Sequence, residues 1–67
     1  MSLSPKELKV LTLVAKGYTD KEIGVNLRIS ERTVQTYLTR IMHKLCARNR
    51  VNAAVLFFVS NPELFGS

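Results

Sequence analysis

The chain has 67 residues, enough for one small domain, and ten Lys and Arg against five Asp and Glu give it a net charge of +5. This balance favours an anionic partner, with nucleic acid first and acidic membrane surfaces second, while plain solubility is the remaining explanation. No apolar run approaches the roughly 18 residues of a membrane span and no secretory signal pattern is present. Cys46 is the only cysteine, which excludes an internal disulfide and a cysteine-based zinc site. We therefore expect a cytoplasmic protein without membrane contact.

Helix start and stop signals appear early in the chain. Residues 4–7 (SPKE) combine an N-cap serine, a proline at the first helical position and a capping-box glutamate. Apolar residues at helical spacing then predict a helix over about 5–16, which Gly17 ends. Residues 19–22 (TDKE) repeat the capping box and predict a short helix over 20–27.

Two further helices follow. Ser30 can cap a third helix, predicted over about 31–46, and Asn49 can cap a fourth over about 50–59. A short capped helix, a turn of a few residues and a longer helix together form the helix-turn-helix plan. No stretch shows the period-two alternation of a strand.

The predicted fold class is therefore all-α, a compact four-helix domain that contains a helix-turn-helix. We place the domain at residues 4–59, after an N-terminal lead (1–3) without structural weight and before a C-terminal tail (60–67). The sequence leaves open whether Leu64 and Phe65 of the tail fold back onto the domain. No nucleophile–base pair or paired-carboxylate site is visible, so we expect no enzymatic activity and no cofactor.

The third helix has two unlike faces. Its apolar stripe, at 100° per residue, comprises Val34, Leu38, Ile41 and Leu45, with Tyr37 and Met42 at its edges. The opposite face lacks carboxylates and comprises Arg32, Gln35, Thr36, Thr39, Arg40 and His43. Basic and hydrogen-bonding side chains suit the major groove of DNA, whereas a carboxylate there would be repelled by phosphates. The alternative is an ordinary solvated helix face, which is usually richer in Glu and Lys.

The acidic residues fall mostly at helix starts, where the helix dipole favours negative charge. The residues in predicted first turns are Glu7, Asp20, Glu22 and Glu31. Helix capping is then expected to account for these acids fully, and the remaining surface to be positive.

Residues 3 to about 58 resemble the LuxR/GerE-type helix-turn-helix domain, the four-helix output module of many bacterial transcription regulators, including the NarL/FixJ response regulators. The landmarks are Glu7, Gly17, Lys21-Glu22-Ile23, Ile29-Ser30, Thr33-Val34, Lys44-Leu45, and Arg50 with Ala53 and Ala54. The chain departs from the family pattern at Gly24, where Ala is usual, and at Cys46, where Gly is common. A basic residue is common at the position of Gln35, and His at that of Tyr37. The resemblance implies sequence-specific binding of double-stranded DNA, with the third helix in the major groove.

Carried over by position, the residues expected to contact base edges are Gln35, Thr36 and Thr39. A Gln amide suits adenine and a Thr methyl suits the thymine methyl, so we expect A·T pairs at the sites they read. The expected phosphate contacts are Lys21, Arg32, Thr33, Tyr37 and Arg40. Alternatively, Tyr37 is an aromatic at the edge of the core and Arg40 a solvated charge.

The fourth helix is apolar on two sides. We expect one face to dock on the core through Ala53, Leu56 and Phe57. A second face, almost opposite, comprises Val51, Ala54, Val55 and Phe58. A protein this small cannot bury both faces, and the resemblance implies a homodimer formed through the second one. Docking against a neighbouring domain is the alternative.

Two other functions stay open: a sigma-factor region-four-like promoter-binding module, and a helical protein-interaction module that does not bind DNA. A DNA-binding regulator would recruit or block RNA polymerase according to where its site lies, and any sensor domain would precede this segment. His43 has no second ligand one turn away, so we expect no metal site. Cys46 is expected to serve as a small residue at a helix end rather than as a redox sensor.

Overall fold

The computed structural model describes residues 3–64, which form four α-helices and a short 3-10 helix. They are α1 (Pro5–Ala15), α2 (Asp20–Leu27), α3 (Glu31–Leu45), α4 (Arg50–Ser60) and η1 (Pro62–Leu64). The all-α prediction is confirmed, and each predicted helix boundary lies within one residue of the observed one. Phe65, whose position the sequence left open, lies outside the described residues.

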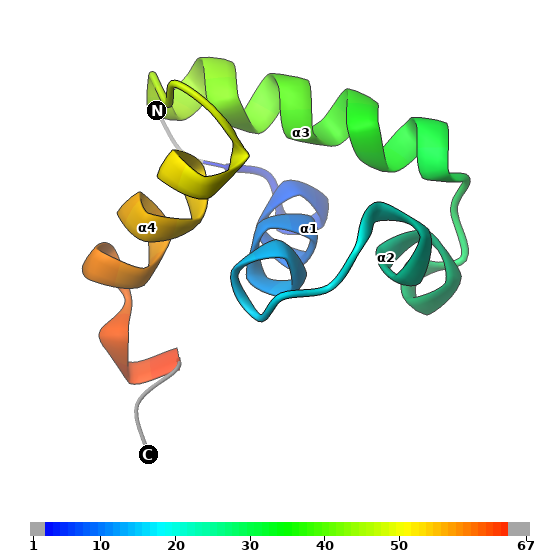
Figure 1. Cartoon of the computed structure of the whole chain (residues 1–67), viewed down its shortest axis with the longest axis horizontal. Coiled ribbons are helices and arrows are strands. Elements are labelled where there is room, and N and C mark those ends of the chain that lie inside the picture. Colours follow the sequence, from blue (N-terminus) through cyan, green and yellow to red (C-terminus); the bar gives the residue numbers. More distant parts are fainter. Residues whose placement is uncertain (1–2, 65–67) are drawn as a thin grey trace.

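The helices pack around α1 (Figure 1). Helix α3 crosses one side of the molecule, with α2 against its N-terminal part and α4 near its C-terminal part. The side of α3 that faces away from α1 is left uncovered by the other helices. Among residues 3–64, no helix combines the length and the apolar character that crossing a membrane requires.

Each helix begins at a side-chain cap, as the sequence predicts. Ser4 Oγ accepts a hydrogen bond from the Glu7 backbone N–H at 3.2 Å, and Glu7 Oε1 accepts one from the Ser4 N–H at 2.8 Å. Thr19 and Glu22 form the same capping box, with distances of 3.1 and 2.8 Å. The caps of α3 and α4 are Ser30 and Asn49. Because these bonds satisfy backbone donors that a helix leaves open, local sequence fixes where each helix starts.

Three helices end through a residue with positive φ. Gly17 (φ 93°) follows α1, and the next N–H, that of Tyr18, reaches the Leu13 carbonyl oxygen at 3.0 Å. Arg28 (φ 59°) and Cys46 (φ 54°) adopt the left-handed conformation after α2 and α3. That conformation costs a non-glycine residue about 1 kcal/mol. Cys46 thus occupies, with some strain, a position where the resembling family commonly has glycine.

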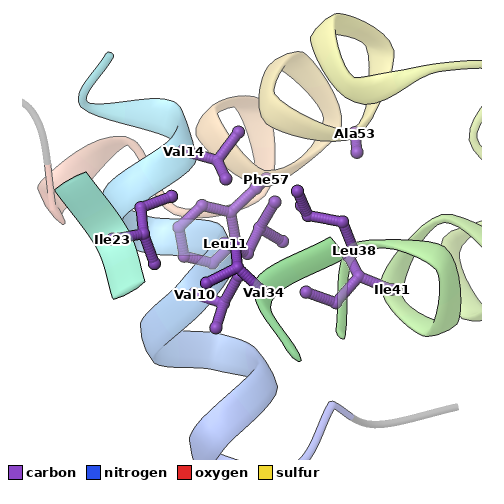
Figure 2. Close-up of a cluster of buried hydrophobic side chains, with 9 residues drawn as sticks. All are labelled: Val10, Leu11, Val14, Ile23, Val34, Leu38, Ile41, Ala53 and Phe57. Atoms are coloured by element: carbon purple, nitrogen blue, oxygen red, sulfur yellow. The ribbon is translucent and has the colours of Figure 1, made fainter. Parts of the chain in front are cut away.

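The core lies between α1, α3 and α4, with one contribution from α2 (Figure 2). Its buried side chains are Val10, Leu11, Val14, Ile23, Val34, Leu38, Ile41, Ala53 and Phe57. Two positions differ from expectation. Leu56, expected to dock on this core, is 39% exposed, whereas Ala53 and Phe57 of the same helix are buried in it. Leu3, assigned to a lead without structural weight, is partly buried and packs against the core.

Gly24 permits a close approach between α2 and the turn that follows it. A β-carbon at this position would lie 2.7 Å from the Ile29 carbonyl oxygen, closer than such atoms can approach. The Ile29 N–H also donates to the Gly24 carbonyl oxygen at 2.9 Å. The turn of the helix-turn-helix is therefore packed directly onto the backbone of α2.

Candidate nucleic-acid interface

Helix α3 has the two faces that its sequence predicts. Val34, Leu38 and Ile41 are buried in the core, and Tyr37 and Met42 are partly buried at its edge. The opposite face is exposed and comprises Arg32, Gln35, Thr36, Thr39, Arg40 and His43. This strip of basic and hydrogen-bonding groups rises about 17 Å along the helix from Arg32 to His43, and it is called the exposed face of α3 below.

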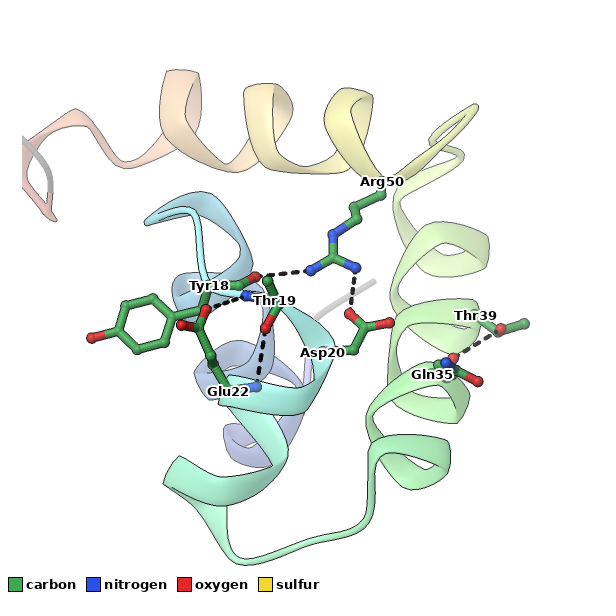
Figure 3. A network of polar contacts seen from close by, with 7 residues as sticks. All are labelled: Tyr18, Thr19, Asp20, Glu22, Gln35, Thr39 and Arg50. Carbon is green, nitrogen blue, oxygen red and sulfur yellow. Dashed lines mark hydrogen bonds and ion pairs between the residues drawn. The ribbon is translucent and has the colours of Figure 1, made fainter.

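The three side chains expected to read bases lie together on this face. Gln35 and Thr39 are one helical turn apart, and Thr36 lies beside Gln35. The hydroxyls of both threonines donate to the helix backbone: Thr36 Oγ1 to the Arg32 carbonyl oxygen at 3.2 Å, and Thr39 Oγ1 to that of Gln35 at 3.0 Å. Figure 3 shows the second of these bonds. The sequence predicts that the three side chains cluster, but it does not predict that both threonine hydroxyls donate to the helix backbone.

The expected phosphate contacts differ in exposure. Lys21, Arg32 and Arg40 are exposed, whereas Thr33 and Tyr37 are partly buried. The Thr33 hydroxyl is 2.8 Å from that of Ser30, beside the cap of α3. Tyr37 packs against the core and is only partly exposed, which fits the alternative of a core-edge aromatic.

The starts of α2 and α3 lie close together. A shallow depression of about 440 Å³ is lined by residues from both starts and from neighbouring segments: Val14, Gly17, Tyr18, Thr19, Asp20, Lys21, Glu31 and Arg50. Lys21 therefore stands near the N-terminal end of the exposed face of α3. Glu31 places one carboxylate at that end, in the first turn of its helix.

Arg50 is not part of the free positive surface. Its guanidinium pairs with the Asp20 carboxylate and donates to the Tyr18 carbonyl oxygen at 3.0 Å (Figure 3). The expectation that capping accounts fully for the acids is wrong here, because Asp20 also neutralises a base 30 positions away in sequence. No local pattern signals such a pair, so sequence reasoning missed it.

A second long-range pair joins α1 to α3. Lys44 Nζ lies 2.8 Å from Glu7 Oε1, and Glu7 is only 3% exposed. The hydrogen bond from Lys44, followed by that from the Ser4 N–H, lowers the pKa of Glu7 below its ordinary value, although burial opposes the shift. Glu7 thus caps α1 and pairs with Lys44 at once, which again corrects the expectation from capping.

The second apolar face of α4 is largely exposed. Val51, Val55 and Phe58 are 70%, 50% and 49% exposed. Ala54, expected on the same face, is partly buried against the core. Together with Val14, Ala15 and Arg50 these four residues line a shallow depression of about 330 Å³. We call Val51, Ala54, Val55 and Phe58 the outer face of α4.

Within residues 3–64, no three His, Cys, Asp or Glu side chains lie close enough together to hold a metal ion. His43 is exposed on α3, and Cys46 is exposed at the end of the same helix.

A capped helix-turn-helix with a basic, carboxylate-free face on its second helix has the architecture of a DNA-binding domain. The profile of the bacterial regulatory proteins of the luxR family matches residues 1–57, so the chain belongs to that family. Membership confirms the resemblance seen in the sequence and supports a role in DNA-binding regulation of transcription. It is a family of regulatory domains rather than of enzymes.

Full-length regulators contain similar segments. The chain is 48% identical over 54 residues to the transcriptional regulatory protein LiaR of Bacillus subtilis, covering 81% of this chain and 26% of that protein. It is 42% identical over 60 residues to the nitrate/nitrite response regulator protein homolog of Haemophilus influenzae, covering 90% and 29%. It is 39% identical over 62 residues to the probable HTH-type transcriptional regulator GfsR of Streptomyces halstedii, covering 92% and 25%. The chain thus spans between a quarter and three-tenths of the length of these curated relatives.

Proposed function

We propose that residues 4–59 form the DNA-binding output domain of a bacterial transcription regulator, which recognises a specific double-stranded sequence. Helix α3 enters the major groove, and Gln35, Thr36 and Thr39 contact base edges. The groups that hold phosphates are Lys21, Arg32, Thr33, Tyr37 and Arg40. Two copies pair through the outer face of α4, so that a dimer reads two half-sites.

One observation carries this proposal: the exposed face of α3. From Arg32 to His43, the outward side of the helix that follows the turn exposes only cationic, amide, hydroxyl and imidazole groups, while its opposite side is buried in the core. A major groove about 12 Å wide accepts one α-helix, and its base edges present donors and acceptors to such groups. The carboxylates of Glu7 and Asp20, which pair with Lys44 and Arg50, lie in α1 and α2. They do not neutralise the basic residues of this face, which therefore stays positive.

The charged contacts make a quantitative prediction about salt. Lys21, Arg32 and Arg40 would neutralise three phosphates in each protomer, or six in a dimer. Each neutralised phosphate releases about 0.9 counterions. A plot of the logarithm of the DNA association constant K against the logarithm of salt concentration should therefore have a slope of about −5 for the dimer. Uncharged Thr33 and Tyr37 would position the backbone without adding to that slope.

The pairing of two copies is supported by the exposure of the outer face of α4. Val51 and Val55 expose half or more of their surface on one side of a short helix, and they line a shallow depression together with Val14 and Ala15 of α1. Burial of such a face against its two-fold mate removes apolar surface from water. A neighbouring domain of a longer protein is the competing occupant, and the oligomeric state decides between the two.

The test is selection of bound sequences from a random duplex pool, with affinity then followed across a salt series. A two-fold-related consensus and a steep negative salt slope would support a dimeric, base-reading regulator. Salt-sensitive binding without a consensus would contradict the assignment of Gln35, Thr36 and Thr39 as base readers. Absence of binding even at low salt would reject DNA binding and favour the protein-interaction module.

What the domain does for transcription follows from its site. A dimer bound beside a promoter can recruit RNA polymerase, and one bound across the promoter can block it. The sigma-factor alternative is disfavoured, because the family profile covers α4 as far as residue 57 as well as the helix-turn-helix. Because the relatives are three to four times longer, we propose that a signal-receiving part is coupled to this domain in the whole regulator.

A further inference from the structure

Thr36 and Thr39, two of the three residues proposed to contact base edges, donate their hydroxyl protons to backbone carbonyl oxygens of their own helix. Thr36 donates to the Arg32 carbonyl oxygen at 3.2 Å and Thr39 to that of Gln35 at 3.0 Å. A hydroxyl carries a single proton. While these bonds persist, neither threonine can donate a hydrogen bond to a base.

The methyl group is the branch of each threonine that remains uncommitted. Both residues are exposed, and the oxygen on Cβ is turned back toward the preceding helical turn. Figure 3 shows the Thr39 oxygen directed toward Gln35 and the other branch of the side chain pointing away from the helix. The groups offered outward are therefore a methyl and the lone pairs of an oxygen that can only accept.

Base edges in the major groove differ in how they meet such groups. Guanine presents only acceptors, N7 and O6, and so requires a donor from the protein. Thymine presents a C5-methyl group, which makes an apolar contact. Cytosine presents an amino donor but no methyl, whereas 5-methylcytosine presents both.

We propose that Thr36 and Thr39 are specificity-determining residues that read C5-methylated pyrimidines, thymine or 5-methylcytosine, through their methyl groups and reject guanine opposite them. This inference rests on the proposed function and names what the site selects. Gln35 differs from both threonines because its exposed amide offers a donor and an acceptor, which suits adenine. Neighbours three residues apart on a helix lie about 5–6 Å from each other, so the two methyls contact neighbouring base pairs, one or two steps apart.

A methyl scan of the bound sequence tests the proposal. In the selected consensus duplex, each thymine is replaced singly by uracil, which removes the C5-methyl group and leaves the hydrogen-bonding pattern intact. We expect at least one replacement in each half-site to weaken binding by about fourfold per site, the value of one buried methyl. A duplex in which 5-methylcytosine, paired with guanine, replaces the same thymine should be bound more tightly than a duplex in which cytosine replaces it.

Variants then assign the methyl contact to a residue. Thr39→Ser keeps the hydroxyl and removes the methyl, so it should abolish the difference between thymine and uracil at one position. Thr39→Val keeps a methyl and removes the hydroxyl, so it should preserve that difference. The same pair of changes at Thr36 should act at a neighbouring position. Thr12→Ser is the matched control, because the Thr12 hydroxyl donates to the Leu8 carbonyl oxygen at 2.7 Å in the same way, but on α1.

Circular dichroism of each variant, at the temperature of the binding assay, checks that it is folded. The proposal is overturned if a consensus exists but no thymine is sensitive to loss of its methyl. It is also overturned if serine variants keep the thymine preference while valine variants lose it, because the hydroxyl would then be the reading group. If the chain selects no sequence at all, the proposed function itself fails, and this inference fails with it.

Discussion

The guanidinium of Arg50, the first residue of α4, donates a hydrogen bond to the carboxylate of Asp20, the first residue of α2 (Figure 3). The same guanidinium donates to the Tyr18 carbonyl oxygen at 3.0 Å. Within residues 3–64 the helices α2 and α4 do not pack directly on each other, so this side chain spans the space between them. It thereby joins the helix proposed to pair two copies to the helix start where Lys21 is proposed to meet a phosphate.

Replacing Arg50 by methionine should lower the free energy of unfolding by about 1 kcal/mol. The change leaves the partly buried Asp20 carboxylate without its partner and removes a charged donor from the Tyr18 carbonyl. Urea unfolding measures the loss. Arg48→Met, at an exposed neighbouring arginine, is the control and should change stability by less than about 0.5 kcal/mol. Equal losses in the two variants would show that the bridge adds no stability.

The pair of Glu7 and Lys44 predicts a loss of stability in acid. Because the pKa of Glu7 is lowered on folding, its ionised form is favoured in the native state. The stabilisation is present above the pKa of an unfolded glutamate, about 4.3, and is lost as pH falls through the lower folded pKa. Stability, measured by chemical unfolding at a series of pH values, should therefore decline below about pH 4.3 partly through this residue.

Glu7→Gln isolates that contribution. The variant should be less stable than the wild type at pH 7, and the difference should shrink as the pH falls through the lowered folded pKa of Glu7, below which the wild-type carboxylate is also protonated. Glu31→Gln removes an exposed first-turn charge of the same kind without a basic partner in the described part of the chain and serves as control. A Glu7→Gln difference that stays constant with pH would argue that the amide disturbs packing rather than the ion pair.

Helix limits were predictable because they depend on neighbours in sequence. Capping boxes at Ser4 and Thr19, and the glycine after α1, involve residues only a few positions apart, so they can be recognised in a short stretch of sequence. The two ion pairs join residues that are 30 and 37 positions apart in sequence, and composition cannot indicate which basic side chain pairs with which acidic one. The orientation of α4 was likewise only partly predictable, because several of its positions are apolar and tertiary packing selects which ones turn inward.

Leu56 and Phe57 provide a test of that orientation. Phe57 is 5% exposed in the core, so Phe57→Ala should lower stability by about 3–5 kcal/mol, enough to unfold much of so small a domain. Leu56 is 39% exposed, so Leu56→Ala should lower it by about 1 kcal/mol. Thermal unfolding followed by circular dichroism compares them. If Leu56→Ala were as damaging as Phe57→Ala, the inward face of α4 would be the one that the sequence first suggested.

The exposed face of α3 was predictable because one period of 3.6 residues separates its polar from its apolar positions. What each side chain offers to DNA was not, since Thr36 and Thr39 carry a hydroxyl and a methyl and the sequence does not say which is used. Tyr37 is a similar case: its position at the boundary between the faces leaves it partly buried, and either role is compatible with the helical period.

Arg40→Gln should weaken binding to the selected duplex and reduce its dependence on salt. The exposed guanidinium is proposed to neutralise one phosphate in each protomer, so the slope of log K against log salt should become less negative by about 2 in a dimer. The base preference should persist, because a phosphate contact carries no sequence information. Lys9→Gln, an equal loss of charge on α1, is the control. Equal changes in slope for both variants would mean that net charge, and not a contact at Arg40, sets the salt dependence.

Val55→Glu should disrupt pairing of two copies while leaving each copy folded. Val55 is 50% exposed on the outer face of α4, so the monomer tolerates a charge there, whereas a two-fold contact would bring two carboxylates together in an apolar environment. We expect cooperative binding to a duplex with two half-sites to be lost, binding to a single half-site to persist and the circular dichroism spectrum to stay helical. Val25→Glu, at a valine of α2 that is 74% exposed, introduces the same charge away from this face and should retain cooperativity. If Val55→Glu binds paired half-sites as cooperatively as the wild type, the outer face of α4 is not the dimer contact, and a neighbouring domain becomes its better partner.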